Sequence, residues 1–197
     1  RPPEEIAALR HYSVNEMRQR AVTGEDRRWS AAGLLDSVLP GHGGEIAPVI
    51  GFGISQDKHA GPAIVNPHGF SVEWLRLKSD HVVGRHLCPD VQVIMVFKGT
   101  LEVTWNLEGE EVSIIAPERS VISVPENSWR RYRALDGDME CILTTQGDQR
   151  KRVYWDETIL EQARAANRCL DPDGYVTAVD LLPETAKRAG LRLEVMP

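Results

Sequence analysis

Two pairs of side chains that could carry out chemistry occur at a spacing of two residues. His86 and Cys88 form one pair, and Arg130 and Tyr132 form the other. Side chains two apart on a β-strand point to the same face, so each pair would act together if its segment is a strand. An imidazole and a thiol can bind a metal ion or exchange protons, whereas a guanidinium is a permanent cation that binds carboxylate or phosphate.

Arg130 is the most informative of these residues, because burying a guanidinium without an anionic partner is costly. Its partner could be an internal carboxylate such as Glu73 or Glu140. It could instead be the carboxylate or phosphate of a substrate, held by two parallel hydrogen bonds. The sequence leaves both alternatives open.

The elements that would position these residues are short strands. From about residue 46 to residue 146 the chain consists of runs rich in Val, Ile, Trp and Thr, divided by Gly, Pro, Asn and Asp. Such spacing predicts an antiparallel sandwich or barrel. The predicted strands are Phe70–Lys78, Val91–Phe97, Leu101–Asn106, Val112–Ile115, Val121–Val124, Trp129–Arg133 and Met139–Thr145.

Helical patterns flank this region on both sides. Residues 1–45 predict a helical N-terminal extension, with one helix through Ser13 and Met17 and a second from Ser30 to Leu39. Residues 147–197 predict a C-terminal helical extension, with a helix capped by Asp156 and a last short helix from about residue 183 to residue 189. The predicted organisation is therefore a central β-barrel, residues 46–146, between two helical extensions.

The segment from Asp80 to Gly99 resembles the first motif of the cupin superfamily, G-x5-H-x-H-x3-4-E-x6-G. His86 falls on the first histidine, Cys88 on the second, Gln92 on the glutamate and Gly99 on the closing glycine. Asp80 stands where the opening glycine belongs.

The second cupin motif, G-x5-P-x-G-x2-H-x3-N, resembles the segment that begins at Arg119. Pro125 matches it, Asn127 replaces its inner glycine, and Arg130 replaces its histidine. Asn enters the left-handed region more readily than most residues, so Asn127 is tolerable there. The resemblance implies a jelly-roll β-barrel with these side chains pointing into its cavity.

The resemblance also implies a site for Fe, Mn, Ni, Cu or Zn, but the ligand set has changed. His86, Cys88 and Gln92 would be the metal ligands, and a thiolate is a good soft ligand. Gln92 lacks the negative charge of the family's glutamate, and Arg130 would place a cation beside the ion. We therefore expect no tightly bound metal, while a His86, Cys88 and Gln92 site stays open as the alternative.

Composition excludes several classes of protein. The 197 residues contain 42% hydrophobic and 26% charged residues, which is typical of a globular chain. The formal net charge of −6 argues against a nucleic-acid partner. The longest apolar stretches are too short to cross a bilayer. Three cysteines without a C-x-x-C pair suit a reducing compartment, so we expect a cytoplasmic protein.

Three functions are compatible with these residues. In the first, the barrel binds a small anionic organic molecule through Arg130 and Gln92, and His86 and Tyr132 exchange protons in an isomerase- or lyase-type reaction without essential metal. In the second, the protein is a metal-dependent dioxygenase or lyase. In the third, it is a non-catalytic sensor or partner subunit. The sequence does not decide whether the protein is an enzyme.

The opposite face of one strand predicts assembly. Val93, Met95 and Phe97 have the parity opposite to that of the cavity residues and would point outward. An exposed apolar face of this kind is typical of an interface. We therefore expect a homodimer or a larger homo-oligomer.

Overall fold

The computed structural model describes residues 11–106 and 111–184, and strands are its main regular elements. Among the described residues, eight strands form one antiparallel sheet. In chain order they are β1 (Glu45–Ile50), β2 (Phe70–Leu77), β3 (Val82–Cys88), β4 (Gln92–Trp105), β5 (Val112–Ala116), β6 (Val121–Val124), β7 (Ser128–Gln146) and β8 (Tyr154–Trp155). The predicted class, a mainly β antiparallel fold, is confirmed.

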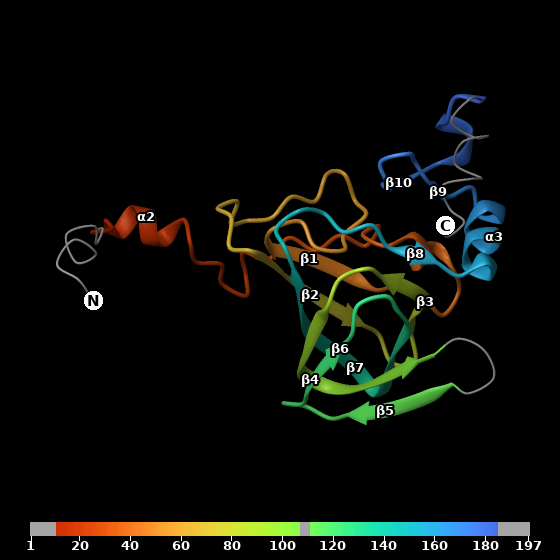
Figure 1. Ribbon diagram of the computed structural model, residues 1–197, viewed down its shortest axis with the longest axis horizontal. Helices are drawn as coiled ribbons and strands as arrows, with labels where there is room; N and C mark the ends of the chain where they lie inside the picture. Colours follow the sequence, from red (N-terminus) through yellow and green to blue (C-terminus); the bar gives the residue numbers. More distant parts are fainter. Residues whose placement is uncertain (1–10, 107–110, 185–197) are drawn as a thin grey trace.

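Two long strands make the sheet curl around an interior (Figure 1). β7 pairs with β2 along its second half and with β3 along its first half, while β4 pairs with β7 along both halves. β4 in turn pairs with β6 and then with β5. The sequence pattern predicted two strands where the structure has one, both for β4 and for β7.

Gly99 lies where the pairing of β4 with β7 shifts register, between Lys98 and Thr100. It has φ +77, and a Cβ atom there would lie 2.6 Å from the carbonyl oxygen of Asp138 on β7. A side chain at this position would therefore be strained and would collide with the neighbouring strand. The core lies inside the curl and includes Leu75, Leu77, Ile94, Leu101, Val103, Ala134, Met139 and Leu143.

The segment before the sheet differs from the prediction. The helix expected through Ser13 is α2 (Val14–Arg18), five residues long, with Ser13 as its N-cap and Glu16 completing a capping box. It buries none of its residues and lies away from the sheet (Figure 1). The part of this prediction that involves residues 1–10 lies outside the described residues.

The predicted helix from Ser30 to Leu39 is wrong. The structure has a four-residue 3-10 helix, η1 (Leu35–Val38), because the preceding residues pack on the edge of the sheet. Ser30 forms a β-bridge with Ile46, and a Cβ atom at Gly33 would lie 2.2 Å from the Ile46 side chain. This tertiary contact outweighs the local helical pattern.

The segment after the sheet contains the predicted helix. This helix, α3 (Glu157–Ala165), begins at the Asp156 cap and buries Ile159, Leu160 and Ala163. It is followed by β9 (Cys169–Leu170), β10 (Val176–Thr177) and η2 (Val179–Leu181). The last predicted helix extends to residue 189 and so lies largely outside the described residues. No helix in the described part of the chain is long and apolar enough to span a membrane.

Candidate functional site

A row of five side chains crosses one half of the sheet and contains two of the predicted site residues. Direct cross-strand pairing runs from Trp155 on β8 to His86 on β3, Arg130 on β7, Trp105 on β4 and Val112 on β5. Directly paired residues share one face of a sheet. His86 and Arg130 are each 1% exposed, Trp105 is half-buried and Val112 is 43% exposed. The row therefore leads from solvent at β5 to the buried pair of His86 and Arg130.

His86 is a neutral imidazole whose tautomer is fixed by its surroundings. Its Nδ1 lies 2.8 Å from the carbonyl oxygen of Gly84, and a carbonyl can only accept a hydrogen bond. Burial, together with the charge of Arg130, lowers the pKa of His86 to about 3. Nδ1 therefore carries the proton, and Nε2 presents a lone pair. Nε2 is buried and has no hydrogen-bond partner among the residues that the structure describes.

Arg130 is bound by backbone carbonyl groups. Its Nε donates to the carbonyl oxygen of Ser128 at 3.0 Å, and its Nη2 donates to those of Pro125 at 2.9 Å and Cys88 at 3.3 Å. Its Nη1 is buried without a hydrogen-bond partner in the described part of the chain. The guanidinium thus ties the turn before β7 to the end of β3 and keeps one donor group unused.

Neither carboxylate named as an internal partner meets Arg130. Glu73 accepts hydrogen bonds from the backbone N–H groups of Ile54 and Ser55, and Glu140 pairs with Arg27 at 2.8 Å. Over residues 11–106 and 111–184, no acidic side chain forms an ion pair with Arg130. Its positive charge is therefore balanced only by neutral groups within the part of the chain that the structure describes.

Tyr132 and Gln92 form a buried chain of hydrogen bonds. The Tyr132 hydroxyl donates to Gln92 Oε1 at 2.6 Å, and Gln92 Nε2 donates to the Thr145 hydroxyl at 3.1 Å. Burial raises the pKa of Tyr132, although the nearby Arg130 opposes this. The Tyr132 and His86 rings meet edge to face with centroids 5.2 Å apart. The structure thus brings His86, Arg130, Tyr132 and Gln92 into one interior.

Cys88 also lies in this interior, but the set does not fit a divalent metal ion. Burial raises the pKa of the Cys88 thiol, so a ligating thiolate is disfavoured. Both polar atoms of Gln92 are engaged, and the positive charge of Arg130 acts on Cys88. Within the described ranges, no group of three or more His, Cys, Asp or Glu side chains could hold a metal ion.

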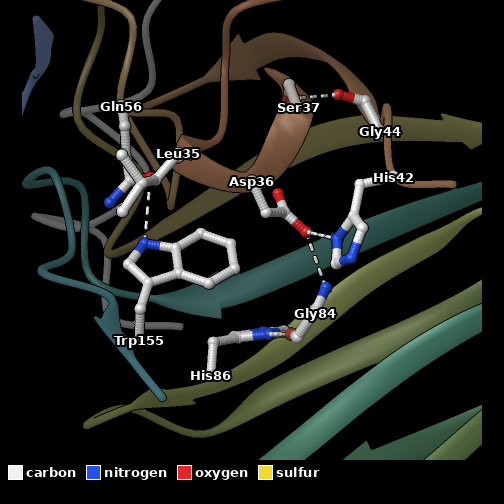
Figure 2. Close-up of polar contacts among 9 residues, drawn as sticks. All are labelled: Leu35, Asp36, Ser37, His42, Gly44, Gln56, Gly84, His86 and Trp155. Atoms are coloured by element: carbon white, nitrogen blue, oxygen red, sulfur yellow. Dashed lines mark hydrogen bonds and ion pairs between the residues drawn. The ribbon is translucent and has the colours of Figure 1, made fainter. Parts of the chain in front are cut away.

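A second buried cluster, shown in Figure 2, is connected to His86 through Gly84. Asp36 on η1 is fully buried, and its Oδ2 accepts from the Gly84 N–H at 2.6 Å and meets His42 Nδ1 at 2.8 Å. The Gly84 carbonyl is the group that fixes His86. The 3-10 helix η1 therefore holds Gly84, the residue whose carbonyl orients His86.

Gln56 makes a similar connection on the other side of His86 (Figure 2). Its Oε1 accepts from the Leu35 backbone N–H at 2.8 Å and from Trp155 Nε1 at 3.2 Å. The Trp155 ring packs on His86 with centroids 5.5 Å apart. Sequence reasoning missed both Asp36 and Gln56. An acidic residue directly after Leu34-Leu35 was the available signal for Asp36.

Comparison with known proteins gives a likeness of fold. No protein-family model matches the chain, and a search of curated proteins finds no match. Among solved structures, oxalate decarboxylase from Bacillus subtilis is 15% identical, with a TM-score of 0.48, over 64% of this chain and 28% of that one. A cupin 2 domain-containing protein from Halorhodospira halophila is 14% identical, with a TM-score of 0.46, over 62% and 77%.

The 7S globulin of Momordica charantia is similar at the same level, being 12% identical, with a TM-score of 0.46, over 62% of this chain and 39% of that one. The chain spans less than a third of the oxalate decarboxylase chain that it matches. At these identities the likeness concerns the fold alone. It does not bear on ligand, reaction or assembly.

Proposed function

We propose that the protein binds a small anionic organic molecule inside the curled sheet, with Arg130 as the group that holds the anion. The observation that carries this proposal is the buried, unpartnered Nη1 of Arg130, whose other donors all go to neutral carbonyl groups. A guanidinium buried without a counter-charge is costly. A carboxylate or phosphate would supply that charge and use the remaining donor.

The cross-strand row supports a route by which such a molecule reaches Arg130. Val112 is 43% exposed and Ile114, two residues along on the same face of β5, is 46% exposed. Their partners on β4 are Trp105 and the buried Val103. These four residues therefore form an aromatic and aliphatic surface that borders the interior at β5. The apolar part of a ligand would rest there.

A reaction at this site would use His86 as the base. Its neutral imidazole presents Nε2 to the interior, which suits proton abstraction from a bound acid. Tyr132 would orient the ligand and return a proton from its hydroxyl, which would turn from Gln92 to the substrate. The proton taken up by His86 would then pass to Tyr132 and restore both groups. This corresponds to an isomerase- or lyase-type reaction without essential metal. The binding proposal does not depend on turnover.

Assembly as a homodimer or larger homo-oligomer is also part of the proposal. On the outer face of the sheet, Met95 is 46%, Phe97 57% and Val121 60% exposed. A second copy would cover this face. Light scattering at micromolar concentration should give at least twice the 22.0 kDa chain mass, whereas a monomer would contradict it.

The three cysteines are free and buried, which supports the cytoplasm as the proposed compartment.

A binding experiment with two arginine variants tests the central proposal. Arg130→Gln removes the interior cation, and Arg131→Gln removes a half-exposed cation on the opposite face of the same strand. Propionate, succinate, lactate, malate and glucose 6-phosphate would be titrated into each protein by calorimetry. Loss of a charged hydrogen bond worth about 1.5–3 kcal/mol weakens binding roughly 10- to 150-fold.

We expect at least one anion to bind the wild type and Arg131→Gln equally and to bind Arg130→Gln at least tenfold more weakly. A fold check by circular dichroism accompanies each variant. Absence of binding by every anion, or equal binding by the folded Arg130→Gln variant, would contradict the proposal.

A further inference from the structure

His86 Nε2 is a hydrogen-bond acceptor that receives no hydrogen bond from residues 11–106 and 111–184. Its tautomer is set by the bond from Nδ1 to the Gly84 carbonyl, so Nε2 has no proton of its own. Two donor groups belong to the rings that pack against it, and both are engaged elsewhere. The Tyr132 hydroxyl donates to Gln92, and the Trp155 indole donates to Gln56. The acceptor therefore stays unsatisfied in the buried interior.

Arg130 Nη1 is the complementary case, a buried donor that makes no hydrogen bond of normal geometry within the described residues. His86 and Arg130 are direct cross-strand partners, and the charge of Arg130 acts on the His86 imidazole. Neighbouring side chains on one face thus present one unused donor and one unused acceptor. A plain carboxylate would satisfy only Arg130, since its oxygens and Nε2 are all acceptors. A group that both accepts and donates would satisfy the pair.

We infer that the ligand is a hydroxycarboxylate, with its carboxylate on Arg130 Nη1 and its hydroxyl donating to His86 Nε2, an inference that rests on the proposed function. An ammonium group is the other common donor beside a carboxylate, as in an amino acid. It would add a second cation next to Arg130. Among the described residues, no carboxylate forms an ion pair with Arg130 that could balance this charge. A neutral hydroxyl avoids this repulsion.

Matched acids that differ by one hydroxyl test this inference. The pairs are malate with succinate, lactate with propionate, and 3-hydroxybutyrate with butyrate, and alanine serves as the amino-acid comparison. Each is titrated by calorimetry into the wild type, His86→Leu and His81→Leu. His81 precedes β3 and lies beside Gly43, outside the row that contains His86 and Arg130, and it serves as the matched histidine control.

For at least one pair, we expect the hydroxy acid to bind the wild type and His81→Leu at least tenfold more tightly than the acid without the hydroxyl. In His86→Leu this preference should disappear while the affinity for the plain acid is retained. Alanine should bind no better than propionate. Should His86→Leu not fold, the 15N chemical shift of His86 Nε2 in the wild type provides the readout. It should move on addition of the hydroxy acid and not on addition of the plain acid.

The outcomes separate this inference from the proposed function. Equal affinities within every pair, with binding still dependent on Arg130, would overturn the hydroxycarboxylate and leave the anion site. A preference for the hydroxy acid that persists in folded His86→Leu would also overturn it, as would a preference for alanine. Absence of binding by all the acids would overturn both.

Discussion

Glu73 should make the protein less stable as the pH rises through neutrality. It lies fully buried on β2, and burial raises its pKa from 4.5 to about 8, although the N–H groups of Ile54 and Ser55 bind its two oxygens and oppose the shift. Between those values the folded chain holds a proton that the unfolded chain has lost. The free energy of unfolding therefore falls with rising pH, by up to about 1.36 kcal/mol per unit.

Between pH 6 and pH 8 this contribution amounts to roughly 2 kcal/mol. His86 acts in the opposite direction, because its folded pKa is lowered to about 3 and its unfolded value is 6.5. The stability that it contributes is lost as the pH falls below 6.5. Between pH 6 and pH 8 its contribution therefore rises, by less than about 1 kcal/mol, and offsets part of the loss from Glu73. The two groups together predict a net loss of between roughly 1 and 2 kcal/mol.

Urea unfolding followed by tryptophan fluorescence at pH 6, 7 and 8 measures this loss. In Glu73→Gln the group cannot titrate, so the decline should vanish even though the variant starts from a lower stability. Glu140→Gln, which removes the carboxylate paired with Arg27, is the matched control and should decline like the wild type. Equal slopes in the wild type and Glu73→Gln, or a wild-type stability that rises over this range, would refute the reasoning.

Substitutions at three residues test other buried contacts by the same unfolding assay at pH 6. Tyr132→Phe leaves Gln92 Oε1 without its donor and should cost about 1–3 kcal/mol. A loss below about 0.5 kcal/mol would show that the bond is unimportant. Asp36→Ala removes the acceptor of the Gly84 N–H and should cost a similar amount. Asp36→Asn keeps an acceptor oxygen and should cost less, so equal losses in the two Asp36 variants would contradict this. Gly53→Ala should destabilise strongly, since Gly53 has φ +53 and its Cβ would lie 2.0 Å from a buried carboxyl.

Much of the sheet could be predicted from the sequence because strand parity is a local property. The two-residue spacing of Arg130 and Tyr132 places both in the interior, as expected. Asn127 has φ +53, in the left-handed region that was predicted for it. The closing glycine of the first motif, Gly99, has φ +77 at the register shift within β4. These features depend on one or two residues and their immediate neighbours.

The partners of the site residues could not be predicted, because they come from distant parts of the chain. Gln92 bonds to Thr145, 53 residues away, and Gly84 bonds to Asp36, 48 residues away. No periodicity specifies such pairs. The same limitation explains the wrong helix at 30–39, where packing of Gly33 against the sheet outweighs the local pattern. The carbonyl groups that surround Arg130 are backbone atoms, which a sequence does not distinguish.

The central claim is that Arg130 binds an anion inside the sheet, and arginine side-chain NMR tests it most directly. In protein labelled with 15N-arginine, Arg130→Gln and Arg131→Gln spectra assign the two guanidinium signals. Titration with malate should shift the Nη resonances of Arg130 to saturation and leave those of Arg131 in place. Arg130 signals that stay unchanged while malate binds elsewhere, or a protein that binds none of the acids, would contradict the account.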